Sequence, residues 1–140
     1  MDSTLTYRGT VYPWHCDHMG HMNVMWYVGK FDEATWQWFS SIGLTPAFLR
    51  EHGRGMAAVE QQISYRRELA AGDAVAVTTR MLEVRDKVLR FVHEMRNENT
   101  GEVAAATTLT AVHLDLATRR ATALPEEIRA RAAARVVAAA

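Results

Sequence analysis

The sequence predicts an α+β fold in which an antiparallel sheet of five to six strands wraps around one long central helix. Residues 24–42 carry apolar side chains at the three-to-four spacing of an amphipathic helix. The second half of the chain holds four strand-length segments separated by turn residues, and one strand-like segment precedes the helix. With 140 residues, of which 49% are hydrophobic, the chain supplies one core, so residues 1–140 are predicted to form a single domain.

The first strand is predicted from Thr4 to Tyr12, a segment that mixes Thr, Val and Tyr and stops at Pro13. The helix follows a polar, Gly-containing loop and ends at Gly43, a residue type common at helix C-termini. Its apolar positions are Val28, Phe31, Trp38, Phe39 and Ile42. A short second helix or turn is predicted for Pro46–His52, before Gly53-Arg54-Gly55.

The remaining strands form an antiparallel meander because tight-turn residues separate them. They are predicted at Met56–Leu69, Asp73–Val84, Lys87–Asn97 and Glu102–Asp115. In the second of these, Val75, Val77, Thr79 and Met81 alternate with Ala74, Ala76, Thr78 and Arg80, and we expect the face with the small residues to pack closely against a helix. A short strand at Arg119–Leu124, a helix beginning at Pro125-Glu126-Glu127, and a continuing helix or frayed tail over Ala130–Ala140 complete the chain.

Charge and composition bear on the possible partners and location of the chain. The 16 basic and 16 acidic residues are interspersed, so no basic stripe favours nucleic-acid binding. No apolar run approaches the roughly 18 residues that span a bilayer, and the N-terminus lacks a signal-peptide pattern. The single Cys16 cannot form an internal disulfide. We therefore expect a cytoplasmic protein that binds neither nucleic acid nor membrane and holds any anionic ligand locally.

The stretch from Tyr12 to Ala34 resembles the signature of the 4-hydroxybenzoyl-CoA thioesterase branch of the hotdog superfamily. That signature, an Asp, two variable residues, Gly-His-hydrophobic-Asn and a Tyr four residues later, stands here as Asp17-His18-Met19-Gly20-His21-Met22-Asn23 and Tyr27. Further matches are Phe31-Asp32-Glu33-Ala34, Tyr65, Ala71-Gly72-Asp73 and Thr100-Gly101-Glu102. Where many relatives carry a second Asn and an acidic residue, this chain has Val24 and His15, which could alter the acyl group that fits.

The resemblance implies a hotdog fold and the hydrolysis of a small-to-medium acyl-CoA or aryl-CoA to free acid and CoA, with Asp17 as the catalytic carboxylate. An ionised Asp can attack the thioester carbonyl or deprotonate a water, and the sequence does not choose between these routes. On its own, Asp17 could equally be a loop or cap residue that positions the helix. No cofactor is needed, since CoA is part of the substrate.

Backbone amides at the start of the long helix are the expected oxyanion site, because unpaired N–H groups converge there. By analogy with the family, the Val24 amide is the first candidate. Gly20 can adopt positive φ and bring the loop close to the ligand. His21 and Asn23 are expected to hold the loop by hydrogen bonds, and either could orient a water or the thioester.

Two other readings of the loop remain open. The run of His15, His18 and His21 beside Cys16 and Asp17 could hold a metal, although no second ligand cluster exists and we assign no metal site. Cys16 could act as a nucleophile between its neighbouring histidines, but neighbours in sequence seldom have the geometry of a dyad.

The remaining site residues are assigned to the substrate. Arg85, Lys87 and Arg90 resemble positions where relatives bind the CoA phosphates, and Arg66 with Arg67 form a second basic cluster. Trp26 is the tryptophan expected to line the acyl pocket, with Tyr27 of the motif nearby; Trp14, Trp36 and Trp38 are expected in the core or at subunit contacts.

The open sheet edge predicts pairing of two subunits into a continuous sheet. The resemblance implies such a homodimer, commonly paired again into a homotetramer, with active sites at the dimer interface. Asp17 and the phosphate-binding residues could then come from different subunits. Two alternatives to a thioesterase are a hotdog enoyl-CoA hydratase or dehydratase and a non-catalytic acyl-CoA-binding protein.

Overall fold

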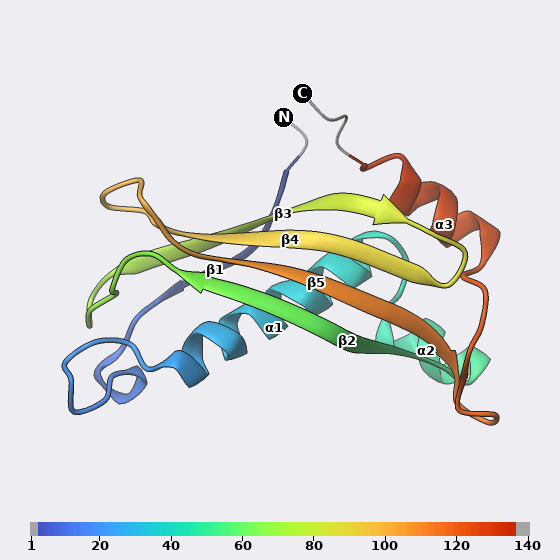
Figure 1. Cartoon of the computed structure of the whole chain (residues 1–140), viewed down its shortest axis with the longest axis horizontal. Helices are drawn as coiled ribbons and strands as arrows, with labels where there is room; N and C mark the ends of the chain where they lie inside the picture. The colour runs from blue at the N-terminus through green and yellow to red at the C-terminus, as the bar shows by residue number, and fades with distance from the viewer. Residues whose placement is uncertain (1–2, 137–140) are drawn as a thin grey trace.

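A curved antiparallel sheet covers one long helix in the computed structural model, which describes residues 3–136 (Figure 1). The elements in chain order are β1 (Thr4–Thr10), a 3-10 turn (Pro13–His15), α1 (Val24–Ser41), α2 (Pro46–His52), β2 (Arg54–Tyr65), β3 (Ala74–Val84), β4 (Val88–Asn97), β5 (Val103–Asp115), β6 (Arg120–Ala121) and α3 (Glu126–Ala133). The predicted fold class, a sheet wrapped around a central helix, is confirmed. No helix among residues 3–136 is long and apolar enough to cross a membrane.

The strands lie in the order β1-β3-β4-β5-β2, and β6 pairs with β5 beside this row. All pairings between these strands are antiparallel, as predicted, but the meander holds only for β3, β4 and β5. Strand β2 pairs with β5 and not with β3, which pairs with β1 instead, so this part of the prediction was wrong. The two strands that bound the row are β1 and β2, and β2 is the longer, with twelve residues. Its outer backbone edge therefore offers a long pairing surface.

Helix α1 begins and ends close to the predicted residues. Its N-cap is Asn23, and the chain leaves the helix through Ile42 and Gly43, whose φ of 98° suits glycine. Phe31 and Trp38 are fully buried on its inner face. They belong to two apolar clusters, one towards each end of α1, that fill the space between the helix and the sheet.

One expectation for β3 was wrong. Val75, Val77, Thr79 and Met81 form the buried face, and the face with the small residues is the half-exposed one. The concave side must fill the space around α1, so large apolar side chains point inward and small ones suffice on the outer side.

Several predicted bounds also differ from the structure, and β1 ends at Thr10 instead of Tyr12. Strand β2 runs from Arg54 to Tyr65, because the amides of Arg66 and Arg67 both donate to the Ala104 carbonyl and leave the ladder. Strand β6 has only two residues, and α3 ends at Ala133. The end of the predicted tail, 137–140, lies outside the described residues.

A buried chain of hydrogen bonds ties α1 to the sheet. His93 on β4 is fully buried, with Nδ1 2.6 Å from Thr79 Oγ1 and Nε2 2.8 Å from Thr35 Oγ1 on α1. Thr79 Oγ1 lies 2.8 Å from Thr6 Oγ1 on β1. The chain thus joins the helix to three strands across the core.

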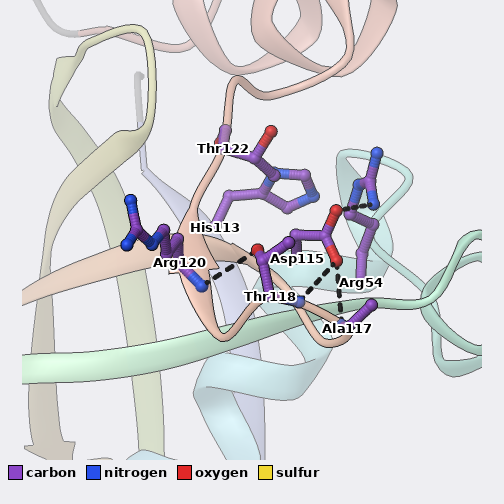
Figure 2. A network of polar contacts seen from close by, with 7 residues as sticks. All are labelled: Arg54, His113, Asp115, Ala117, Thr118, Arg120 and Thr122. Carbon is purple, nitrogen blue, oxygen red and sulfur yellow. Dashed lines mark hydrogen bonds and ion pairs between the residues drawn. The ribbon is translucent and has the colours of Figure 1, made fainter.

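A second polar network fixes the end of the sheet where β2 begins (Figure 2). Arg54 pairs with Asp115 at 3.1 Å, and the other oxygen of Asp115 accepts hydrogen bonds from the amides of Ala117 and Thr118 in the β5–β6 turn. His113 is fully buried, and its Nδ1 donates to the Thr122 carbonyl at 3.1 Å. These contacts fix the position of the first residue of β2. At roughly 3.3 Å per residue, this residue lies about 36 Å from the last residue of the strand.

Candidate active site

Asp17 lies in a tight turn directly before α1. Its amide donates to the His21 carbonyl at 3.1 Å, and the Gly20 amide donates to the Asp17 carbonyl at 3.0 Å. Gly20 has a φ of 86°, the positive value expected for it, which a side-chain-bearing residue adopts only with strain. The turn therefore fixes the position of Asp17 relative to the helix.

Two donors hold the Asp17 carboxylate in one orientation. Oδ1 accepts from the Met19 amide at 2.9 Å, and Oδ2 accepts from Asn23 Nδ2 at 2.8 Å. The hydrogen bond from Asn23 lowers the pKa of Asp17, and the Met19 amide lowers it further. Asp17 is consequently a half-buried, oriented anion at neutral pH.

Asn23 connects this carboxylate to the helix. Its Oδ1 accepts from the Met25 amide at 2.9 Å and caps α1, while its Nδ2 donates to Asp17. Within residues 3–136, no acceptor pairs with the Val24 amide, the first of the helix. An anionic carboxylate and a free N–H group at the positive end of the helix dipole thus line the same hollow at the start of α1.

A groove of about 450 Å³ opens at this point, and it is formed by the Asp17 turn, the start of α1 and the segment after β2. In it, His21 Nε2 lies 2.8 Å from Glu68 Oε2. Tyr27 donates its hydroxyl to the Arg67 carbonyl at 3.1 Å and packs edge-on against Tyr65, with ring centroids 5.2 Å apart. The lining residues are Asp17, Met19, His21, Met22, Val24, Tyr27, Tyr65, Arg66, Arg67 and Glu68.

The neighbours of Asp17 in sequence serve the loop. His15 is buried, its Nδ1 accepts from the Tyr12 amide at 3.0 Å, and burial together with the Lys30 charge lowers its pKa. The Cys16 thiol faces the Tyr12 carbonyl at 3.8 Å. In the described part of the chain, no three His, Cys, Asp or Glu side chains are placed to hold a metal ion.

Some predicted substrate residues do not reach the groove of their own chain. Arg85, Lys87 and Arg90 lie at the β3–β4 turn, where the Lys87 carbonyl accepts from the His113 amide, at the end of the sheet opposite Asp17. Arg85 and Arg90 also both pair with Glu83. Trp26 packs on His15 at 4.5 Å between ring centroids and does not line the groove.

Glu68 is the groove residue that the sequence reading missed. It lies 45 residues after Asn23 (68 minus 23) and reaches the helix start because the Leu69 carbonyl accepts from the Met22 amide at 2.7 Å. Only its charge, next to the Arg66-Arg67 pair, could have drawn attention to it. That charge is typical of any surface loop.

The sequence comparisons all match thioesterases. The sequence profile of the thioesterase-like superfamily matches residues 11–132. The chain is 34% identical over 109 residues to the L-carnitine dehydrogenase/betainyl-CoA thioesterase of Agrobacterium fabrum; the match covers 78% of this chain and 22% of that longer protein. It is 26% identical over 129 residues to the long-chain acyl-CoA thioesterase FadM of Escherichia coli, covering 92% of this chain and 94% of FadM.

Solved structures share the fold. Protein SAV2348 from Staphylococcus aureus, solved in complex with CoA, matches with a TM-score of 0.89 and 24% identity over 96% of this chain and 85% of that chain.

Proposed function

Because the chain belongs to the thioesterase-like superfamily of hotdog-fold thioester hydrolases, we propose that it hydrolyses an acyl-CoA to free acid and CoA, with Asp17 as the attacking group. The observation that carries the assignment of Asp17 is its oriented carboxylate in the same groove as the free Val24 amide. A thioester needs an attacking oxygen and a donor for the developing oxyanion. A thiolate leaves readily, so no acid is required for it.

In the proposed reaction, a carboxylate oxygen of Asp17 attacks the thioester carbon and the Val24 N–H stabilises the oxyanion. The C–S bond breaks, CoA leaves as the thiolate, and a water molecule hydrolyses the resulting anhydride. The same carboxylate can instead deprotonate a water that attacks the carbonyl, and in both routes the ionised form, which the lowered pKa of Asp17 favours, is the reactive one. His21, held by Glu68, is placed in the groove to orient the water or the thioester.

The groove supports Arg66, from the second basic cluster of the sequence, as a candidate for the CoA phosphates. Arg66 lines it and makes no ion pair among residues 3–136, whereas Arg67 pairs with Glu102 at 3.0 Å. A free guanidinium is well suited to phosphate. Arg85, Lys87 and Arg90 stay a prediction that requires a second copy of the chain.

We propose that the chain forms a homodimer through β2, and that dimers pair into a tetramer. The twelve-residue outer edge of β2 supports the dimer, since long open edges are templates for pairing. In a two-fold antiparallel pairing of complete β2 strands, Arg54 of one copy lies opposite Tyr65 of the other. The Asp17 groove of each copy then adjoins the first residues of the partner strand.

The relatives do not favour one acyl group. The two curated relatives described above are named for different acyl groups, one betainyl and one long-chain. We further propose a cytoplasmic location, which the free thiol of Cys16 supports.

A thiol-release assay over short, medium, long, aromatic and betainyl thioesters of CoA tests the proposed function. We expect release of CoA with at least one class, and free acid in equal amount. Crotonyl-CoA that loses its double bond without thiol release would instead indicate a hydratase. Tight binding of the whole panel without turnover would indicate a binding protein.

A further inference from the structure

A polar hollow lies on the outer face of the sheet, the face turned away from the buried core. Its volume is about 390 Å³, and residues of β2, β5, β4 and β3 line it. The strand register places Gln62, Thr108, Val92 and Arg80 in one row across these four strands. At about 4.8 Å between neighbouring strands, Arg80 lies about 14 Å from the edge strand β2.

Two arginines of this hollow carry charges without a partner. Among residues 3–136, neither Arg66 nor Arg80 makes an ion pair. Arg80 is half-buried, so it has lost part of its hydration without gaining a carboxylate. Glu94, the carboxylate that lines the hollow, pairs with Arg96 at 3.4 Å. The hollow therefore offers two guanidinium groups to an anionic ligand.

Arg66 connects this hollow to the Asp17 groove. It lines both cavities of the same chain, because it directly follows β2, at the point where the backbone leaves the ladder. A ligand with its reactive end at Asp17 can pass Arg66 and continue over the outer face of the sheet. This path needs no second copy of the chain. Arg66 lies at its entrance, and Arg80 lies farther along it.

We propose that the hollow binds the nucleotide end of CoA, with Arg66 on the diphosphate and Arg80 on the ribose phosphate. The order follows from the covalent structure of the substrate. From the thioester outward, CoA carries the pantetheine arm, then the diphosphate, and last the ribose with its phosphate and adenine. Guanidinium groups bind phosphate oxygens through paired N–H donors. The inference rests on the proposed thioesterase function and extends it to recognition of the nucleotide.

The size and polarity of the hollow suit a nucleotide. Pockets for ligands of this kind enclose roughly 300–1,000 Å³, and the hollow lies within this range. Gln62, Ser64 and Thr108 contribute an amide and two hydroxyls, which can both donate and accept hydrogen bonds to a ribose and a base. Gln62 and Ser64 are exposed, so the ligand stays in contact with water. A highly charged group can therefore bind here without complete desolvation.

Thioesters that lack parts of the nucleotide test the assignment. Acyl-dephospho-CoA lacks only the ribose phosphate, and acyl-pantetheine lacks the whole nucleotide. With the best acyl group of the panel, we expect the unaltered chain to favour acyl-CoA over acyl-dephospho-CoA by a factor on the order of 10 in kcat/KM, the scale of one hydrogen bond to a charged group. The difference should lie in KM and not in kcat, because the ribose phosphate is remote from the reacting atoms.

Variants of the two arginines separate their roles. Arg80→Gln should lower the ratio of kcat/KM between acyl-CoA and acyl-dephospho-CoA toward one. Arg80→Lys should retain part of this ratio, because the positive charge stays. Arg66→Gln should instead lower the ratio between acyl-dephospho-CoA and acyl-pantetheine, because these two substrates differ in the diphosphate.

Arg120→Gln is the matched control. Arg120 is exposed on β6, lies outside the hollow and makes no ion pair among residues 3–136. The ratio between acyl-CoA and acyl-dephospho-CoA should therefore stay as in the unaltered chain.

Three results would overturn the proposal. They are a ratio near one in the unaltered chain, an equal fall in Arg80→Gln and Arg120→Gln, and a fall in Arg90→Gln that Arg80→Gln does not show. The last result would place the ribose phosphate at the β3–β4 turn. If acyl-CoA is hydrolysed without preference over acyl-dephospho-CoA, the inference fails and the thioesterase function stands. If no thioester of the panel is hydrolysed, the proposed function itself fails.

Discussion

At the scale of single residues, Asn23 joins the fold to the chemistry. One end of its amide caps α1 and the other orients Asp17. The sequence predicted that Asn23 would hold the loop, because the residue type and its place before the helix fit a cap. The bond to the carboxylate depends on the turn geometry at Gly20, which spacing alone does not give.

Replacing Asn23 separates these two roles. Asn23→Ser keeps a good capping residue but removes the donor to Asp17. Because this donor lowers the pKa of Asp17, its loss raises that pKa. Asp17 must be ionised to attack, so the pH below which kcat/KM falls should move upward, while the unfolding free energy changes by only a few tenths of a kcal/mol. An unchanged acid limb in the pH profile would show that the bond does not tune the carboxylate.

His93 bears on the stability of the fold and not on the reaction. Burial lowers its pKa to about 3, so the ring is neutral in the folded protein at neutral pH. The chain of hydrogen bonds through His93 has five contacts and ends at the carbonyls of Val77 and Phe31. The three threonine hydroxyls and the one N–H of a neutral ring supply only four hydrogens for them. One contact therefore lacks a hydrogen unless the ring is protonated, and desolvation opposes that protonation.

This buried ring makes stability depend on pH. A folded pKa of about 3 lies below the ordinary value of 6.5, so between these values the unfolded state binds the proton more readily. The neutral buried ring contributes to the unfolding free energy above pH 6.5. This contribution is lost as the pH falls, by about 2 kcal/mol between pH 7 and pH 5. Denaturant titrations at pH 7 and pH 5, at a fixed protein concentration, measure this change. The difference in unfolding free energy between the two pH values should be smaller by about 2 kcal/mol for His93→Gln than for the unaltered chain. Equal pH dependence in the two proteins would contradict the neutral buried state.

At the scale of elements, long periodic segments could be predicted and their mutual placement could not. Helix α1 and the turns around Gly72 and Gly101 follow from local patterns, and both glycines have positive φ. The β3–β4 turn, which carries Arg85 and Lys87, lies at the opposite end of the sheet from Asp17. The local sequence of a turn does not indicate whether the turn lies at the same end of the sheet as the start of the helix.

The edge strand β2 carries a prediction of its own. Val59 is an exposed apolar residue on this strand, with 61% of its surface accessible, at an irregularity in the β2–β5 register. Val59→Lys should weaken the dimer at least tenfold, because charged residues on an edge oppose strand pairing. Sedimentation velocity measures this directly. Leu5→Lys, at a 55% exposed position on the opposite edge strand β1, should leave the dimer intact. A dimer that resists Val59→Lys and yields to Leu5→Lys would place the interface on β1.

At the scale of the whole molecule, the sheet wrapped around α1 exposes the start of the helix at one end and the edge of β2 along its length (Figure 1). The first feature provides the fixed carboxylate and the free amide within one chain. In the proposed dimer, the second brings another chain and its distant basic residues alongside. The fold could be predicted because one apolar helix and one amphipathic sheet have few ways to bury each other. The shared site could be predicted only as an expectation, since it depends on a surface between chains.

The central claim is that Asp17 performs the chemistry. Asp17→Asn removes the charge and keeps the shape, so folding and dimer formation should be unchanged while thiol release slows by a factor on the order of 10² or more, the scale of losing a key acid, base or nucleophile. Glu51→Gln, at an exposed Glu of α2 that does not line the groove, is the control and should retain full turnover. The decisive measurement is kcat for thiol release by Asp17→Asn on the best substrate of the panel. A loss of 10² or more in a folded protein is the predicted result, and turnover near that of the unaltered chain would contradict the assignment.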